Sequence, residues 1–183
     1  MKKLFVFLAC SVAAIAFSSC TKSAWERSYS HKSYVKIGDL KWATKNVGAT
    51  KDNPYGELFT YEQALKACPD GWRLPTSREL EQLSQFYSVP VSYDGMNGMW
   101  FSGSTPYKEG VDAVFLPMAG GDCGYGREEF GSLGYYWSST EGRLDSYGVY
   151  RAYYLSVSGW GGNVGGNGDS ARSCGFSVRC LKN

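Results

Sequence analysis

The sequence contains only one histidine, His31, and the residues after Cys20 contain no Cys-x-x-Cys pair. A Ser–His or Cys–His nucleophile pair needs a histidine inside the folded domain, and structural zinc needs closely spaced ligands. Because His31 falls in a polar stretch that we interpret below as a tether, neither kind of site is expected. A phosphate-binding glycine loop followed by Lys and Ser or Thr is also lacking. We therefore expect no enzyme activity, no metal and no other cofactor.

Paired carboxylates are the one catalytic arrangement that the composition leaves open, because many glycosidases use two acidic side chains. The candidates are Asp112, Asp122, Glu128 and Glu129. Glu128 and Glu129 follow Arg127 in a loop flanked by glycines. This setting indicates solvated surface residues rather than a catalytic pair.

Long apolar runs and strong charge are missing as well. The apolar run over residues 4–17 is shorter than the ~20 residues that a membrane-spanning helix needs. The 183-residue chain has a formal net charge of +2, and its Lys and Arg are scattered. Nucleic-acid-binding domains cluster these residues on one face, so no nucleic-acid partner is expected. The length suits one domain with a short appendage.

The first 19 residues have the order of an export signal. Lys2 and Lys3 precede the apolar run, and Ser18 and Ser19 precede Cys20. This order resembles bacterial lipoprotein signal peptides, which implies cleavage before Cys20, lipidation of Cys20 and a place in the bacterial cell envelope, on the outer membrane. Residues 20–33 then form a flexible tether. The alternatives are a buried N-terminal helix, or secretion without lipid, since Phe17 stands where Leu is more usual.

Four cysteines remain for the folded part if Cys20 carries lipid. An even number in an exported protein indicates disulfides. Three pairings of Cys68, Cys123, Cys174 and Cys180 are possible. We favour Cys68 with Cys180, because Cys68 follows an expected helix and Cys180 sits in the expected last strand. Cys123 with Cys174 would follow by elimination.

The folded part is expected at residues 34–183, with two helices early and short strands later. Residues 60–67 have helical spacing. A second helix begins at Thr76, because Thr76 and Glu79 form a capping box. Its buried stripe would be Leu80, Leu83, Phe86 and Tyr87, and Pro90 would end it. The expected strands are 34–37, 40–46, 99–102, 113–117, 135–138, 150–157 and 175–181. Gly-rich loops separate most of them, so the pattern predicts an α+β fold.

Several strings carry a resemblance when they are taken together and in order. They are Val35-Lys36-Ile37-Gly38, Tyr55-Gly56-Glu57-Leu58-Phe59, Cys68-Pro69-Asp70-Gly71-Trp72-Arg73-Leu74-Pro75, Tyr135-Tyr136-Trp137-Ser138-Ser139 and Gly175-Phe176-Ser177-Val178-Arg179-Cys180. The chain over residues 34–182 resembles the Fibrobacter succinogenes major paralogous domain family. That resemblance implies a C-type-lectin-like fold, with two helices, a small twisted antiparallel sheet and long Gly-rich loops. It also supports the pairing of Cys68 with Cys180.

The calcium-binding strings of true C-type lectins are absent from the sequence, which has no Glu-Pro-Asn, Gln-Pro-Asp or Trp-Asn-Asp. Calcium-dependent sugar binding therefore does not carry over. The copper-binding cysteine pair of formylglycine-generating enzymes has no clear counterpart either.

Residues 143–174 contain no Lys, Glu, Gln or Met. Every residue there except Trp160 can be reached from an Asn codon by changing adenines alone. This pattern is similar to the variable regions diversified by diversity-generating retroelements, although a Gly-rich loop could share it by coincidence. On the strand 150–157, Leu155 and Val157 should face the core and Tyr154 should face outward. The candidate ligand-binding residues are Tyr147, Tyr150, Tyr154, Ser156, Ser158, Trp160, Asn163, Asn167, Asp169 and Arg172.

The composition of this segment suits recognition. Tyr offers a large contact area at low entropic cost, and Ser, Gly and Asn offer adaptable hydrogen bonds. We therefore expect a membrane-tethered lipoprotein that binds an extracellular protein or glycan. The alternative is a structural lipoprotein of the cell envelope whose aromatic residues mainly pack the core.

Overall fold

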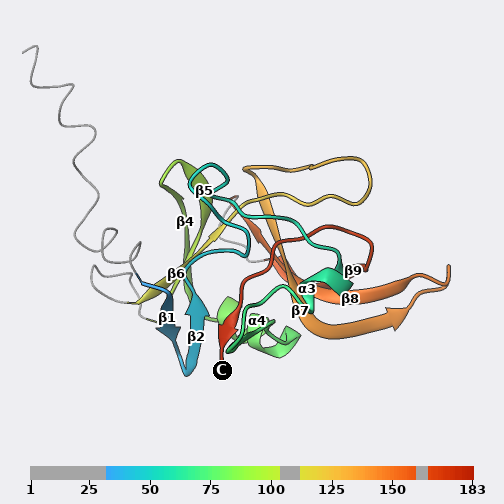
Figure 1. Ribbon diagram of the computed structural model, residues 1–183, viewed down its shortest axis with the longest axis horizontal. Coiled ribbons are helices and arrows are strands. Elements are labelled where there is room, and N and C mark those ends of the chain that lie inside the picture. The colour runs from blue at the N-terminus through green and yellow to red at the C-terminus, as the bar shows by residue number, and fades with distance from the viewer. Residues whose placement is uncertain (1–31, 104–111, 160–164) are drawn as a thin grey trace, which may run out of the picture. The chain divides into compact units, whose positions relative to one another are not determined.

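The computed structural model describes residues 32–103, 112–159 and 165–183 (Figure 1). Residues 33–183 form one compact unit. The predicted signal peptide, Cys20 and residues 20–31 of the predicted tether lie outside the described residues, and so do Trp160 and Asn163.

The described chain contains two helices and ten strands. The helices are α3 (Tyr61–Ala64) and α4 (Ser77–Ser84). The strands are β1 (Tyr34–Ile37), β2 (Leu40–Ala43), β3 (Trp72–Arg73), β4 (Tyr87–Tyr93), β5 (Met96–Ser102), β6 (Ala113–Pro117), β7 (Leu133–Leu144), β8 (Tyr150–Ser158), β9 (Gly165–Ala171) and β10 (Leu181–Lys182). The fold is therefore α+β, as the sequence predicts.

Both helices start where their side chains can satisfy free backbone groups. At α4, the Thr76 hydroxyl accepts a hydrogen bond from the Glu79 N–H (3.3 Å), and the Glu79 carboxylate accepts one from the Thr76 N–H (2.8 Å). This is the predicted capping box. At α3, the Gln63 side chain accepts a hydrogen bond from the Thr60 N–H at 2.9 Å.

The predicted end of the second helix is wrong. The helix α4 stops at Ser84, and Tyr87 begins β4. Leu80 and Leu83 are buried as expected, but Tyr87 is exposed. Pro90 lies inside β4, where it is tolerated because β4 is the edge strand of its sheet.

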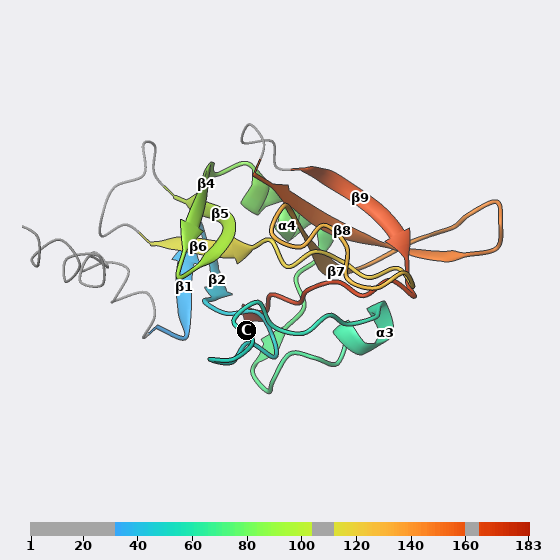
Figure 2. The same ribbon diagram turned by 90° about the horizontal axis from the view of Figure 1, so that it is seen from above.

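The strands form three small antiparallel sheets instead of the single sheet that the resemblance implies. Their orders are β1-β2-β10-β3, β4-β5-β6 and β7-β8-β9. The turn between β1 and β2 contains Gly38 with a φ of 59°, a conformation that glycine adopts without strain. The helix α4 packs against the sheet β7-β8-β9 (Figures 1 and 2).

The last predicted strand is also different in the structure. Only Leu181 and Lys182 form a strand, while Gly175, Phe176 and Ser177 make single bridges to three separate segments. This stretch runs through the interior, so both of its faces are covered. Ser177 is consequently buried although it alternates with the apolar Phe176 and Val178, a pattern typical of a strand with one solvent-facing side.

Arg179, which alternates with Val178 and Cys180 in the same way, is buried too. Its Nε and Nη2 donate to Asn46 Oδ1 at 2.9 and 2.7 Å, and its Nη1 donates to the Ala43 carbonyl at 2.8 Å. Buried charged groups are tolerated when hydrogen bonds satisfy them in this way. The last stretch of the chain is therefore a central element of the interior.

Two disulfides close the unit. Cys68 is bonded to Cys180 and Cys123 to Cys174. These are the two pairs favoured from the sequence. The first joins the segment after α3 to the residue before β10, so it links an early part of the unit to its end.

Candidate functional site

The β7–β8 hairpin extends beyond the neighbouring elements in both views (Figures 1 and 2). Its end carries four exposed apolar side chains, which we call the hairpin tip: Leu144 is 56% exposed, Tyr147 90%, Val149 39% and Tyr150 63%. Leu144 and Tyr150 are a cross-strand pair that flanks the turn. Exposed apolar groups gathered in this way mark interaction surfaces more often than single exposed residues do.

The turn of the hairpin tip is fixed by one carboxylate. Asp145 Oδ1 accepts hydrogen bonds from the Tyr147 N–H (3.0 Å) and the Val149 N–H (2.9 Å). The Asp145 backbone N–H also donates a hydrogen bond to the Val149 carbonyl at 3.0 Å. Gly148 has a φ of 77°, which allows the chain to turn here. These bonds, led by that from Val149, lower the pKa of Asp145. The tip is therefore ordered before any ligand arrives, which reduces the entropic cost of binding.

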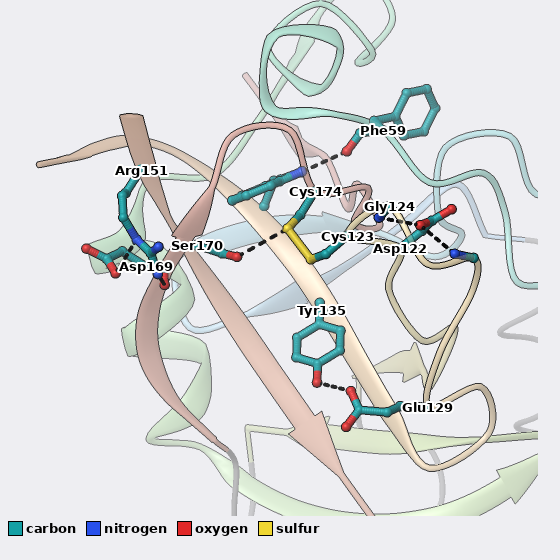
Figure 3. Close-up of a disulfide and its surroundings, with 12 residues drawn as sticks. Phe59, Asp122, Cys123, Gly124, Glu129, Tyr135, Arg151, Asp169, Ser170 and Cys174 are labelled. Atoms are coloured by element: carbon teal, nitrogen blue, oxygen red, sulfur yellow. Dashed lines mark hydrogen bonds and ion pairs between the residues drawn. A yellow bond between two sulfur atoms is a disulfide. The ribbon is translucent and has the colours of Figure 1, made fainter. Parts of the chain in front are cut away.

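Two arginines hold the base of the hairpin. Arg151 Nε lies 3.1 Å from Asp169 Oδ1, and its Nη1 lies 3.5 Å from Asp145 Oδ2. Arg151 thus connects the turn to strand β9, and Figure 3 shows its pair with Asp169. Asp169, one of the candidate ligand-binding residues, lies within β9 and is engaged in this ion pair.

Arg172 is the second of these arginines, and its side chain is only 19% exposed. Its guanidinium lies 3.5 Å from Glu62 Oε1 and 3.1 Å from Glu141 Oε2. It also lies over the rings of Tyr61 and Tyr150, at 4.8 and 5.4 Å from their centroids. These partners engage the guanidinium within the protein and hold it against the Tyr150 ring.

Tyr154 lies on the β8 face opposite Leu155, as predicted, but it does not project freely into solvent. Its half-buried ring packs against Tyr135, Trp137 and Phe176, with centroids 5.6, 6.3 and 5.0 Å away. Burial raises the pKa of its hydroxyl. The expectation that Tyr154 is an exposed anchor is therefore corrected: the segment around Phe176 covers a face that the sequence pattern left open.

The other predicted site residues do not all gather at one surface. Ser156 and Ser158 are half-buried in the second half of β8, away from the hairpin tip. In an antiparallel ladder, the pairing of Tyr153 with Asp169 and of Tyr154 with Gly168 puts Asp169 on the face opposite Tyr154. Asn167 belongs to β9, but its side chain lies outside the described residues. Among the predicted residues whose side chains the structure describes, Tyr147 and Tyr150 are the exposed ones.

Leu144 and Val149 were missed from the sequence. They flank the turn Asp145-Ser146-Tyr147-Gly148, and apolar residues beside a turn at the end of a hairpin are displayed outward. A turn signal between two strands of alternating pattern could have found them.

A second loop beside the same sheet is also tightly fixed (Figure 3). The Asp122 carboxylate accepts hydrogen bonds from the N–H groups of Gly124 (2.8 Å) and Gly126 (3.2 Å). The Tyr135 hydroxyl donates to the Glu129 carboxylate, and burial together with this carboxylate raises the pKa of Tyr135. Asp122 and Glu129, two of the candidate catalytic carboxylates, thus hold the loop in place.

No group of three or more His, Cys, Asp and Glu side chains is arranged to hold a metal ion within residues 32–103, 112–159 and 165–183. In the same part of the chain, no helix has the length and apolar character needed to cross a membrane. Comparison of the chain with protein-family models, with curated proteins and with solved structures gives no match.

Acid should loosen the hairpin tip through Asp145. The pKa of this group is lowered on folding, so its contribution is fully present above the ordinary value of 3.8 and is lost as the pH falls through the lower folded value. We expect the amides of Tyr147 and Val149 to exchange faster with solvent at those acidic pH values. Hydrogen exchange measured by NMR checks this.

Asp145→Asn is the matched control for the acid experiment, because an amide oxygen can accept the same two hydrogen bonds without titrating. Its tip amides should keep the same protection across the acidic range after correction for intrinsic exchange. Equal acid sensitivity in the wild type and in Asp145→Asn would contradict the role given to the carboxylate.

Proposed function

We propose that this protein is a membrane-tethered lipoprotein whose C-type-lectin-like domain binds an extracellular protein or glycan through the hairpin tip. The observation that carries the proposal is the exposure of Leu144, Tyr147, Val149 and Tyr150 on a turn fixed by Asp145. Tyrosines on rigid supports are frequent binding hot spots. Solvent exposure of an ordered apolar cluster has a structural cost that a binding role would explain.

The tether and the fold belong to the same proposal. The order of Lys2, Lys3, the apolar run and Cys20 supports lipidation of Cys20 in the envelope of a bacterium, on the outer membrane. Small antiparallel sheets, two helices and a disulfide between early and late segments are compatible with a C-type-lectin-like domain. Mass spectrometry of the N-terminal peptide tests the lipid, since Cys20→Ser should abolish the acylated species.

Diversification of residues 143–174 would fit this arrangement, because the segment contains all four residues of the hairpin tip and the strand β9. We therefore propose that the segment 143–174 is diversified. Sequencing of the neighbouring DNA tests it: a near-copy of the segment that differs only at adenines is expected. A neighbourhood without such a copy would remove this part and leave the binding role standing.

A structural envelope lipoprotein is the second candidate, and one observation favours it. Tyr154, Asp169 and Arg172 are engaged within the protein instead of being displayed. In that case the hairpin tip would have no dedicated ligand, and its substitution would change nothing but solubility.

Loss of the two tip tyrosines separates the candidates. We expect Tyr147→Ala/Tyr150→Ala to bind about 30-fold more weakly than the wild type, since hot-spot side chains contribute about 2 kcal/mol or more. Both rings are mostly exposed, so the free energy of unfolding should change by about 0.5 kcal/mol or less. The probes are arrays of glycans and of extracellular proteins, with hits confirmed by titration.

Tyr125→Ala is the matched control, because Tyr125 is 87% exposed but lies in the loop of the second disulfide. It should bind as the wild type does. Equal binding by the double variant and the wild type, or no binding to either array, would favour the structural candidate.

A further inference from the structure

A groove of about 460 Å³ lies between α3, β3, α4 and β7, beside the disulfide of Cys68. Its size suits a small ligand, since such sites usually measure about 300–1,000 Å³. None of the residues that line it belongs to the hairpin tip. Its lining combines an apolar part with a small number of polar groups, which is the usual composition of ligand sites.

The apolar part consists of Leu65, Trp72 and Leu74. Leu65 is 42% exposed although it is a large apolar residue. Trp72 is half-buried and is held in the short strand β3 by pairing with Lys182. The Lys182 ammonium lies 6.0 Å from the centre of the Trp72 ring. A fixed aromatic ring therefore lines a concave and partly exposed surface.

The two charged side chains that line the groove, Arg73 and Glu79, have opposite charges. Arg73 Nη1 and Nη2 donate to the Glu79 carboxylate oxygens at 2.8 and 2.5 Å, which is a bidentate pair. The hydrogen bond from Arg73 is the main cause that lowers the pKa of Glu79 to about 2. Both groups therefore stay charged at neutral pH and cancel each other. The lining residues themselves therefore carry no net charge, while Lys182, beside the Trp72 ring, lies outside the lining.

Two further polar groups in the groove have unused hydrogen-bonding capacity. Among the described residues, neither the indole N–H of Trp72 nor the hydroxyl of Ser139 makes a hydrogen bond. The backbone of Ser139 is nevertheless fixed, because its N–H donates to the Pro75 carbonyl at 2.7 Å and its carbonyl accepts from the Tyr61 hydroxyl at 2.9 Å. The groove thus offers a donor and a hydroxyl at fixed positions.

We propose that this groove binds a neutral saccharide, with the Trp72 ring against a C–H face of the sugar. Saccharides present an apolar C–H face together with hydroxyls that both donate and accept hydrogen bonds. Ser139 and the remaining N–H groups of Arg73 supply partners for those hydroxyls, and the cancelled charges of Arg73 and Glu79 in the lining favour a neutral sugar over sugar acids and amino sugars. This site acts independently of the hairpin tip.

Saturation-transfer NMR and calorimetric titration of the protein purified from its full-length gene test the proposal. The probes are methyl glycosides of glucose, galactose, mannose and N-acetylglucosamine, the disaccharides maltose, cellobiose and lactose, and the charged sugars glucuronate and glucosamine. At least one neutral sugar should bind saturably in the millimolar range or tighter, and the charged forms should bind more weakly. Trp72→Ala should weaken that binding about tenfold or more.

Ser139→Ala is the second variant, because it removes only a hydroxyl and keeps the fold even if Trp72→Ala does not. It should weaken binding several-fold. Tyr147→Ala/Tyr150→Ala should bind the sugar as the wild type does. The proposal is overturned if no sugar of the panel binds, or if Ser139→Ala binds as the wild type does. It is also overturned if only the tip variant loses the sugar, and that last result would instead support the proposed function.

Discussion

Replacement of both Cys68 and Cys180 by serine should lower the free energy of unfolding by about 5 kcal/mol, because the two cysteines are 112 residues apart. A disulfide that closes so long a loop removes much of the conformational entropy of the unfolded chain. The bond also ties the segment beside the groove to the buried residues before β10, where Cys180 packs in the core. Urea denaturation under non-reducing conditions measures the loss.

Cys123→Ser/Cys174→Ser is the matched control for the disulfide prediction. These cysteines are 51 residues apart, so the same loop-entropy argument gives about 4 kcal/mol. The variant without Cys68 and Cys180 should therefore be the less stable of the two. The reverse order, or a loss below about 1 kcal/mol in both, would contradict the loop-entropy account.

Trp137→Ala should lower the free energy of unfolding by about 4 kcal/mol, the largest effect that we expect from a single substitution in this chain. The side chain is fully buried, and its ring centroid lies 4.4 Å from that of Phe176 and 5.7 Å from that of Tyr61. Its indole N–H donates to the Phe59 carbonyl at 2.8 Å. The alanine would leave a cavity under the β7–β8 hairpin, and the Phe59 carbonyl would keep only one of its two donors, the Phe176 N–H.

Trp137→Phe divides this cost into its two parts. Phenylalanine keeps an aromatic ring but removes the indole N–H and some volume, so a loss of about 1–3 kcal/mol is expected. Chemical denaturation of both variants supplies the comparison. If Trp137→Ala were as stable as the wild type, the aromatic cluster could not be the support of the hairpin.

Local signals in the sequence predicted much of the fold. The capping box of Thr76 and Glu79 begins a helix, and the strands β1 and β6 have the predicted bounds. Both disulfide pairs agree with the sequence reasoning. These features depend on residues that are close in the chain, or on how few cysteines there are to pair.

The strands β4 and β9 were not predicted from the sequence, and each contains residues that are unusual in strands. Pro90 hides β4, because a proline is compatible with a strand only at an edge that the sequence does not reveal. In β9, Gly165, Gly166 and Gly168 make the segment resemble a loop. Pairing with β8 keeps it extended in spite of their low strand propensity.

The candidate site was only partly predictable because alternation gives the face of a strand but not what covers it. Tyr154 lies on the expected face, and Phe176, distant in sequence, packs on that face. Arg172 was expected in contact with a ligand, whereas Glu62 and Glu141 neutralise it. Substitution of Tyr154 or Arg172 by alanine would therefore disturb packing as well as any binding, which makes the tip tyrosines the better test.

Hydrogen–deuterium exchange of the protein with and without its array-identified ligand tests the central claim most directly. The account predicts slower exchange over residues 144–151 in the complex, with the interior strands unchanged. Unaltered exchange across those residues, together with new protection elsewhere on the domain, would contradict the claim that the hairpin tip is the binding surface.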